Sequence, residues 1–138
     1  MTPAQLIAEA RTWLGTPFVA NQSCKQVGAD CIGMIAGAAM AIGMVIRYRS
    51  NYPQRPDGSL HKELSAQMLP VACADMRPGD VLTMDMSRDG GEPHHLALFT
   101  GQTIIHAYTQ ARKCVEQPYV DFWQKKVRRI YRFREFSE

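Results

Sequence analysis

The 138-residue sequence contains few cysteines, and none are spaced as structural sites require. There are four, at positions 24, 31, 73 and 114, and no two have C-x-x-C spacing. Disulfide-stapled domains use more cysteines and zinc modules use closer pairs, so neither class is expected. At least one cysteine is therefore a candidate for chemistry.

Long apolar runs are also missing. One uncharged stretch, residues 31–46, is apolar, rich in glycine and alanine and shorter than a membrane span requires. The N-terminus mixes acidic and basic residues and lacks the positive start and apolar run of a secretory signal. The sequence predicts no membrane span and no signal peptide, and residues 31–46 are better explained as a buried core helix.

An excess of one charge is missing as well. Sixteen Lys and Arg against thirteen Asp and Glu give a net charge of +3, so nucleic acid is not an expected partner. Six of the basic residues lie between positions 125 and 134 and alternate with apolar ones, which predicts a strand with one basic face. We interpret it as a solvated edge strand protected by charge, with a phosphate- or partner-binding patch as the alternative.

The remaining composition, 46% hydrophobic and 21% charged, is that of a globular protein, and the length fits a single domain over residues 1–138. Thr2 and Gln5 form a capping box that predicts a first helix. Asp30 is placed to cap a second helix that starts at Cys31, whose glycines permit close packing. We expect this second helix to be the core of the domain.

Beyond the second helix, a short surface helix is expected around residues 60–68, where His61 should be solvated. From residue 77 onward the spacing of the apolar residues changes to that of strands. Strands are predicted at residues 81–86, 95–100, 103–108, 114–117 and 127–133. Because helices precede strands, the fold class predicted is α+β, with N-terminal helices packed on a mainly antiparallel sheet of about five strands.

Cys31 is the first candidate for chemistry. A thiol at a helix N-terminus lies near unpaired amides and the positive end of the helix dipole, which favour the thiolate. We therefore expect the pKa of Cys31 to lie well below its ordinary value of about 8.5. The other three cysteines lack this setting and are interpreted as packing residues, a role that stays open for Cys31 too.

The register of one predicted hairpin indicates which histidine could act as the general base for Cys31. If residues 101–102 form a two-residue turn, His95 and His106 are diagonal neighbours about 7 Å apart on one face, whereas His94 points to the other. His95 would then take the thiol proton while His106 holds its ring in place, as in a catalytic triad. Ala97, on the face of His95, is small enough to let the core helix approach. Simple packing of the two rings is the alternative.

Five motifs occur in a characteristic order. Residues 11–18 read R-T-W-L-G-T-P-F, 28–33 read G-A-D-C-I-G, 77–82 read R-P-G-D-V-L, and 95–107 contain H-L-A-L-F-T-G followed by I-I-H-A. In this order they resemble the NlpC family of papain-like cell-wall cysteine peptidases. The sequence is most similar to short, single-domain members encoded with tail genes of bacteriophages and gene transfer agents. The resemblance implies a papain-like fold.

It also implies a role for each matched residue. Cys31 corresponds to the nucleophile, His95 to the general base and His106 to the third polar member. Members of the family usually carry a tyrosine at the position of Phe18, which helps to bind the oxyanion, and Phe18 lacks that hydroxyl. The oxyanion should then rely on the backbone N–H of Cys31, at the helix start that Asp30 caps.

The resemblance further implies the reaction. The protein would hydrolyse an amide in the peptidoglycan peptide stem, between the γ-carboxyl of D-glutamate and diaminopimelate or lysine, without cofactor or metal. Because no signal peptide is expected, the protein would be made in the cytoplasm and carried to the periplasmic cell wall in a virion-like tail. Its partners would then include other phage-like tail or baseplate proteins.

Two alternatives from other classes stay open. One is a structural tail-tip or hub protein that keeps the fold with weak or no catalysis, which Phe18 favours. The other is a metal-binding module built from Cys24, Cys31, Cys114 and the histidines, which their irregular spacing disfavours.

Overall fold

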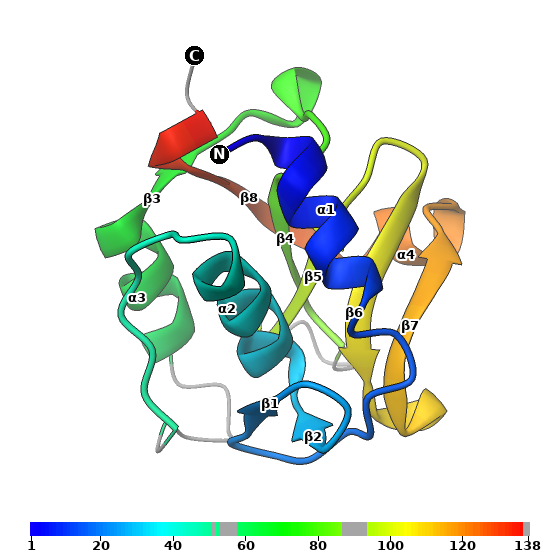
Figure 1. The fold of residues 1–138 in the computed structure, drawn as a ribbon. Helices are drawn as coiled ribbons and strands as arrows, with labels where there is room; N and C mark the ends of the chain where they lie inside the picture. Colours follow the sequence, from blue (N-terminus) through cyan, green and yellow to red (C-terminus); the bar gives the residue numbers. More distant parts are fainter. Residues whose placement is uncertain (51, 53–57, 87–93, 137–138) are drawn as a thin grey trace.

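The computed structural model describes residues 1–50, 52, 58–86 and 94–136, with helices first and a sheet after them (Figure 1). The helices are α1 (Pro3–Arg11), α2 (Cys31–Ala41), α3 (Ser59–Gln67) and α4 (Asp121–Gln124). The strands are β1 (Ser23–Cys24), β2 (Gly28–Ala29), β3 (Met68–Pro70), β4 (Val81–Met84), β5 (His95–Phe99), β6 (Thr103–Tyr108), β7 (Lys113–Pro118) and β8 (Val127–Phe133). The predicted α+β class is confirmed.

The main sheet has the order β3-β8-β4-β5-β6-β7, and its paired strands are antiparallel. It has six strands, one more than expected, because β3, for which no strand is predicted, follows directly after the third helix. β1 and β2 form a separate two-stranded sheet beside the start of α2. Within the described residues, no helix is long and apolar enough to cross a bilayer.

The capping box of α1 forms as predicted. The Thr2 hydroxyl accepts the backbone N–H of Gln5, and the Gln5 side chain accepts the backbone N–H of Thr2. These bonds satisfy amides that a helix start leaves unpaired. The helix then buries Leu6, Ile7 and Ala10 in the core.

The second helix packs closely because two of its residues have no side chain. A Cβ at Gly33 would lie 1.9 Å from the backbone oxygen of Gln22, and one at Gly37 would lie 2.3 Å from the Trp13 ring. Met34, Ala38 and other residues of α2 are buried against the sheet. In Figure 1, α1 and α2 lie in front of β4 and β5. The expectation that α2 is the core helix is confirmed.

The two faces of the sheet carry different clusters. Leu96, Leu98 and Ile105 belong to the core shared with α1 and α2. Ala97 and its neighbours pack on the other face with Trp123 of α4. The expectation that Ala97 lets α2 approach is therefore wrong, because alternation along β5 turns Ala97 away from that helix.

The basic strand β8 is not an edge strand. It lies between β3 and β4 and pairs with both. Arg132 makes a two-pronged ion pair with the buried Asp80, with both N···O distances 2.8 Å. The interpretation of β8 as an exposed, charge-protected edge is wrong, because the short strand β3 has no strand pattern in the sequence. Asp80 is a structural residue, as its turn motif suggests.

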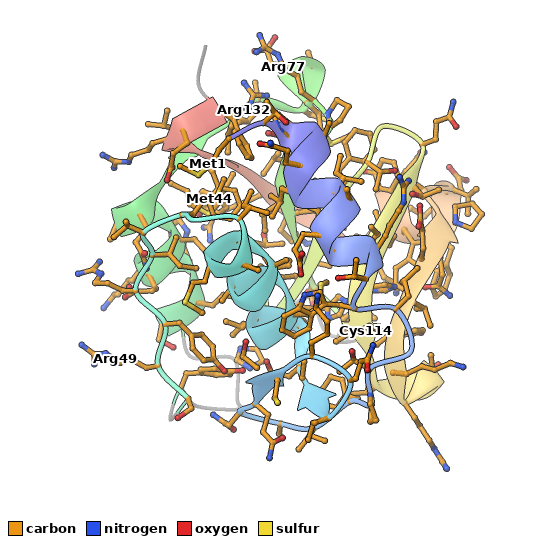
Figure 2. All side chains as sticks on the ribbon, in the orientation of Figure 1. Met1, Met44, Arg49, Arg77, Cys114 and Arg132 are labelled. Atoms are coloured by element: carbon orange, nitrogen blue, oxygen red, sulfur yellow. The ribbon has the colours of Figure 1, made fainter. Side chains whose placement is uncertain are left out.

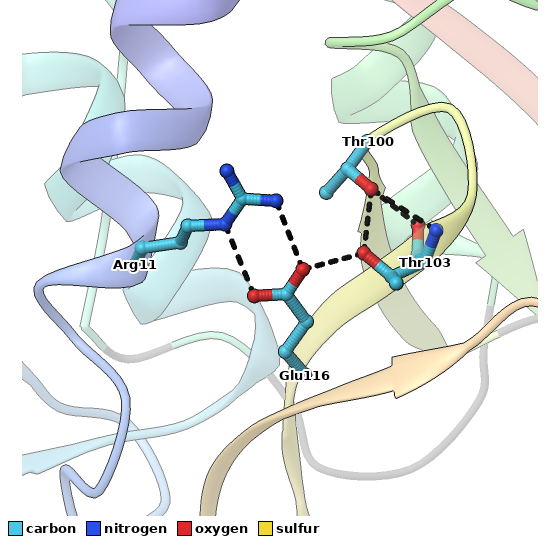
Figure 3. Close-up of polar contacts among 4 residues, drawn as sticks. All are labelled: Arg11, Thr100, Thr103 and Glu116. Atoms are coloured by element: carbon cyan, nitrogen blue, oxygen red, sulfur yellow. Dashed lines mark hydrogen bonds and ion pairs between the residues drawn. The ribbon is translucent and has the colours of Figure 1, made fainter.

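A surface clamp joins α1 to the β6–β7 pair (Figure 3). Arg11 donates two hydrogen bonds to Glu116, at 3.1 and 3.0 Å, and Glu116 accepts a third from the Thr103 hydroxyl at 2.6 Å. The bidentate geometry fixes the relative orientation of the two side chains but adds little to the stability of the fold, because the arginine is half exposed. The clamp holds β7 in register beside β6.

Candidate active site

The start of α2 is fixed by a buried carboxylate. Asp30 is 3% exposed; one oxygen accepts the N–H of Gly33 at 2.8 Å. The other oxygen accepts the N–H of Asn21 at 2.8 Å and the hydroxyl of Tyr52. Asp30 therefore caps the helix as predicted and also ties two loops to it. This arrangement holds Cys31, the first helical residue, in a defined position.

A gap in the sheet receives the Cys31 thiol. β5 and β6 pair at Leu98–Ile105 and at Phe99–Ile104, and this pairing does not extend to the first residues of β5. The Cys31 sulfur lies 3.9 Å from the backbone oxygen of His94 and accepts a hydrogen bond from the backbone N–H of Leu96. These two residues flank His95, so the sulfur sits beside the backbone of His95 where the strands separate.

The opposite side of this gap holds a chain of side-chain hydrogen bonds. Nε2 of His95 lies 2.7 Å from Nδ1 of His106, and Nε2 of His106 lies 2.7 Å from the side-chain oxygen of Gln117. His106 is fully buried, stacked on Tyr108 and edge-on to Trp123. The predicted hairpin register and the contact between His95 and His106 are confirmed.

Some expected contacts are not made. Within the described residues, no hydrogen bond joins the Cys31 thiol directly to an imidazole ring. His94 lines a cavity with Ile32, the residue after Cys31. Phe18 is partly buried against the core cluster and offers no polar side-chain atom. No group of three metal-binding side chains occurs in the part of the chain that is described.

Beside the thiol lies a partly open cavity of about 340 Å³. Its walls combine apolar, aromatic and basic side chains: Ile32, Arg47, Tyr48, Arg49, Tyr52, Ser59, Leu60, Glu63 and His94. A second cavity of about 510 Å³ shares five of these residues and continues between α2, α3 and the sheet. In Figure 2, Arg49 extends outward at the edge of the molecule near this region. The wall carries both charges, and Arg47 and Glu63 form an ion pair at 3.3 Å.

Three residues make contacts that are not predicted from the sequence. Gln117 shares a face with His106, since His106 pairs with Val115 and Gln117 is two residues further on, but no turn motif predicts the register of β7. Tyr52 contacts Asp30 from a loop that carries no motif. His61, expected to be solvated, instead hydrogen-bonds the buried hydroxyl of Tyr131.

A comparison with known protein families identifies the family of this chain. The model of the NlpC/P60 family matches residues 15–132, which is most of the chain. The chain belongs to the NlpC/P60 family. No curated protein sequence matches it.

Solved structures share the fold. An NlpC/P60 family protein from Bacillus cereus ATCC 10987 superposes with a TM-score of 0.73 at 20% identity, over 95% of this chain and 40% of that one. The NlpC/p60 domain of the peptidoglycan hydrolase SagA gives 0.69 at 21%, over 95% and 98%. The peptidoglycan hydrolase RipB from Mycobacterium tuberculosis gives 0.64 at 19%, over 94% and 63%. The chain thus spans less than half of the Bacillus cereus protein.

The electrostatics of this NlpC/P60 site differ from the expectation for Cys31. Burial raises the pKa of the Cys31 thiol to about 12, although backbone N–H groups of Leu96, Ile32 and Cys31 itself act in the opposite direction. The expected lowering is wrong, because loss of hydration outweighs what the helix start supplies. Buried Cys114, which has no helix start, also has its pKa raised to about 12. Cys31 is therefore a neutral thiol at rest.

The imidazoles are neutral as well. Burial, with the neighbouring rings of His106 and His94, lowers the pKa of His95 to about 3. Burial also lowers the pKa of His106, against the opposing effect of the hydrogen bond that His106 donates to Gln117. A neutral imidazole has a lone pair that can accept a proton, but the low pKa of His95 makes it a weak base towards the Cys31 thiol in this resting arrangement.

Alkylation kinetics test this resting state. The rate of Cys31 modification by iodoacetamide should rise continuously from pH 6 to pH 9, because the reactive thiolate stays a minor species below a pKa of about 12. The exposed Cys24 and Cys73 should be labelled first. Peptide mapping of timed samples measures both. A rate at Cys31 that is already maximal at pH 6.5 would instead indicate a preformed thiolate.

Stability should depend on pH through the same histidines. In the folded state His95 stays neutral down to about pH 3, whereas the unfolded chain takes up a proton near pH 6.5. The unfolded state therefore binds more protons below pH 6.5, and the free energy of unfolding falls as pH drops towards 3. Urea denaturation at several pH values should show this slope and a shallower one in His95→Gln. Equal slopes in the wild type and in His95→Gln would contradict a neutral His95 in the folded state.

Proposed function

We propose that this NlpC/P60 domain is a cysteine endopeptidase that hydrolyses an amide in the peptide stem of peptidoglycan. The observation that supports it most is the position of the Cys31 sulfur, at a capped helix start and beside the backbone of His95, whose ring contacts His106. A thiol with an imidazole base is suited to acyl transfer, whereas glycoside cleavage normally needs two carboxylates.

The reaction follows from these groups. Because Nε2 of His95 contacts His106, Nδ1 is the nitrogen left to take the proton from the Cys31 thiol. The sulfur attacks the carbonyl carbon, and the oxyanion forms near the N–H groups at the start of α2. The C–N bond breaks as the imidazolium returns its proton to the departing amine. Water, deprotonated by the same ring, then hydrolyses the thioester and frees the carboxylate and the thiol.

The substrate and delivery route form the finer part of the proposal. The bond is the one between the γ-carboxyl of D-glutamate and diaminopimelate, and Arg49 in the cavity wall suits a carboxylate of such a stem, whereas Arg47 is paired with Glu63. The protein is carried to the periplasmic wall as a component of a phage or gene transfer agent tail tip. The resemblance to short tail-encoded members of the family supports this route, and antibody labelling of tail particles tests it.

Mass spectrometry of digested peptidoglycan tests the activity. The expected products are shortened stems with new amino termini at diaminopimelate, on intact glycan strands. New reducing sugar ends would contradict the proposal. A protein that binds the wall and yields no product would favour the alternative, a structural tail protein with the same fold. Two features of the described residues favour that alternative: Phe18 offers no hydroxyl, and no hydrogen bond joins Cys31 to an imidazole.

A further inference from the structure

The hydrogen-bond chain from His95 does not end at His106. Gln117, on β7, accepts a hydrogen bond from Nε2 of His106 at 2.7 Å. Its neighbour Glu116 points the other way, into the clamp with Arg11. The strand therefore presents a neutral amide to the buried ring and keeps its carboxylate away from it. This amide is the last member of the hydrogen-bonded chain His95–His106–Gln117.

We propose that Gln117 is a positioning residue that sets the proton arrangement on both imidazoles. An amide oxygen only accepts hydrogen bonds, so Nε2 of His106 must carry a proton. Nδ1 of the same neutral ring is then an acceptor, and it receives the N–H of His95 Nε2. Nδ1 of His95 is left with a lone pair. The proposal rests on the proposed function, in which that lone pair takes the thiol proton.

The opposite arrangement would disable the site. If His106 carried its proton on Nδ1, it would donate to Nε2 of His95, and the His95 proton would move to Nδ1. A protonated Nδ1 cannot accept the thiol proton, and in a serine peptidase the wrong tautomer alone costs about 10⁴-fold in kcat. Gln117 therefore favours the active tautomers of these two rings over the inactive ones.

The surroundings of His106 leave this task to Gln117. The ring is fully buried, stacked on Tyr108 at 5.1 Å between centroids and edge-on to Trp123 at 4.9 Å. These aromatic contacts fix the plane of the ring and offer its nitrogens no acceptor. Among the described residues, the partners of the two His106 nitrogens are His95 and Gln117. Since His95 can both donate and accept, the orientation of the Gln117 amide, with its oxygen towards Nε2 of His106, is what breaks the symmetry.

Long-range ¹H–¹⁵N NMR of the full-length protein tests the proposal without any need for activity. The wild-type spectrum should show both His95 and His106 protonated on Nε2. Gln117→Leu should give a mixture of tautomers, whereas Gln117→Glu, which keeps an accepting oxygen, should retain the wild-type pattern. Glu116→Gln serves as the matched control on the same strand and should leave the tautomers unchanged.

Kinetics provide the second measurement. Gln117→Leu should lower kcat by about 10-fold to 100-fold with KM within twofold, and Gln117→Glu should restore most of it. Wild-type tautomers in Gln117→Leu, or equal losses in both variants with unchanged tautomers, would overturn the proposal. If the wild-type protein cleaves no stem peptide, the proposed function fails, while the NMR result still decides the role of Gln117.

Discussion

Substitution of Cys31 by alanine should reduce stem-peptide cleavage by at least about 10³-fold while the fold is kept. The loss is expected because the sulfur forms the covalent bond to the acyl group, and no other thiol lies at a helix start beside the hairpin of the histidines. The side chain is small and sits at the end of the core, so the melting temperature should change little. Cleavage is measured by chromatography of stem peptides.

Cys114→Ala is the matched control. Cys114 is buried like Cys31 (1% and 8% exposed), and burial raises its pKa to about 12 in the same way, but it lies in β7 rather than at a helix start. This variant should keep near wild-type activity. Equal losses in Cys31→Ala and Cys114→Ala would mean that activity responds to packing of the core, and it would contradict a nucleophilic role for Cys31.

The second large effect is expected at His95, with the adjacent histidine as its control. His95→Ala should lower kcat/KM by at least about 10²-fold, because the variant has no group to take the thiol proton. His94→Ala should keep most of kcat, since the His94 ring lines the cavity and the His95 ring contacts His106. A change in KM alone is expected there.

This pair of variants is informative because the structure leaves both histidines close to Cys31. The sulfur lies against the backbone of His94, and the His94 side chain lines the cavity beside the start of α2. If His94→Ala loses as much kcat as His95→Ala, or more, then His94 is the base and the proposed line of side chains is wrong. Steady-state kinetics on one stem peptide decides between them.

The sequence predicts those features that depend on local rules. The capping box of α1, the Asp30 cap of α2 and the two-residue turn between β5 and β6 each follow from a few neighbouring residues. The turn fixes the register of the hairpin, and that register is enough to place His95 and His106 side by side. Local rules thus locate most of the candidate site.

The features that the sequence does not predict depend on contacts between distant segments. β8 is expected at an edge because β3, only three residues long, gives no strand signal. The expected direction of the Cys31 pKa is wrong because helix-start amides can be inferred from the sequence, whereas the depth of burial cannot. The sequence gives no indication of the role of Gln117, because its contact with His106 depends on the register of β7, which no short turn determines.

The identity of the nucleophile is tested most directly by trapping the covalent intermediate. The wild-type protein is mixed with excess stem peptide, quenched in acid, digested and mapped by mass spectrometry. The expected adduct is the acyl part of the substrate on the peptide that contains Cys31, removable by hydroxylamine as a thioester is. An acyl group mapped to any other residue, or undiminished cleavage after complete alkylation of Cys31, would contradict the proposed role of this thiol.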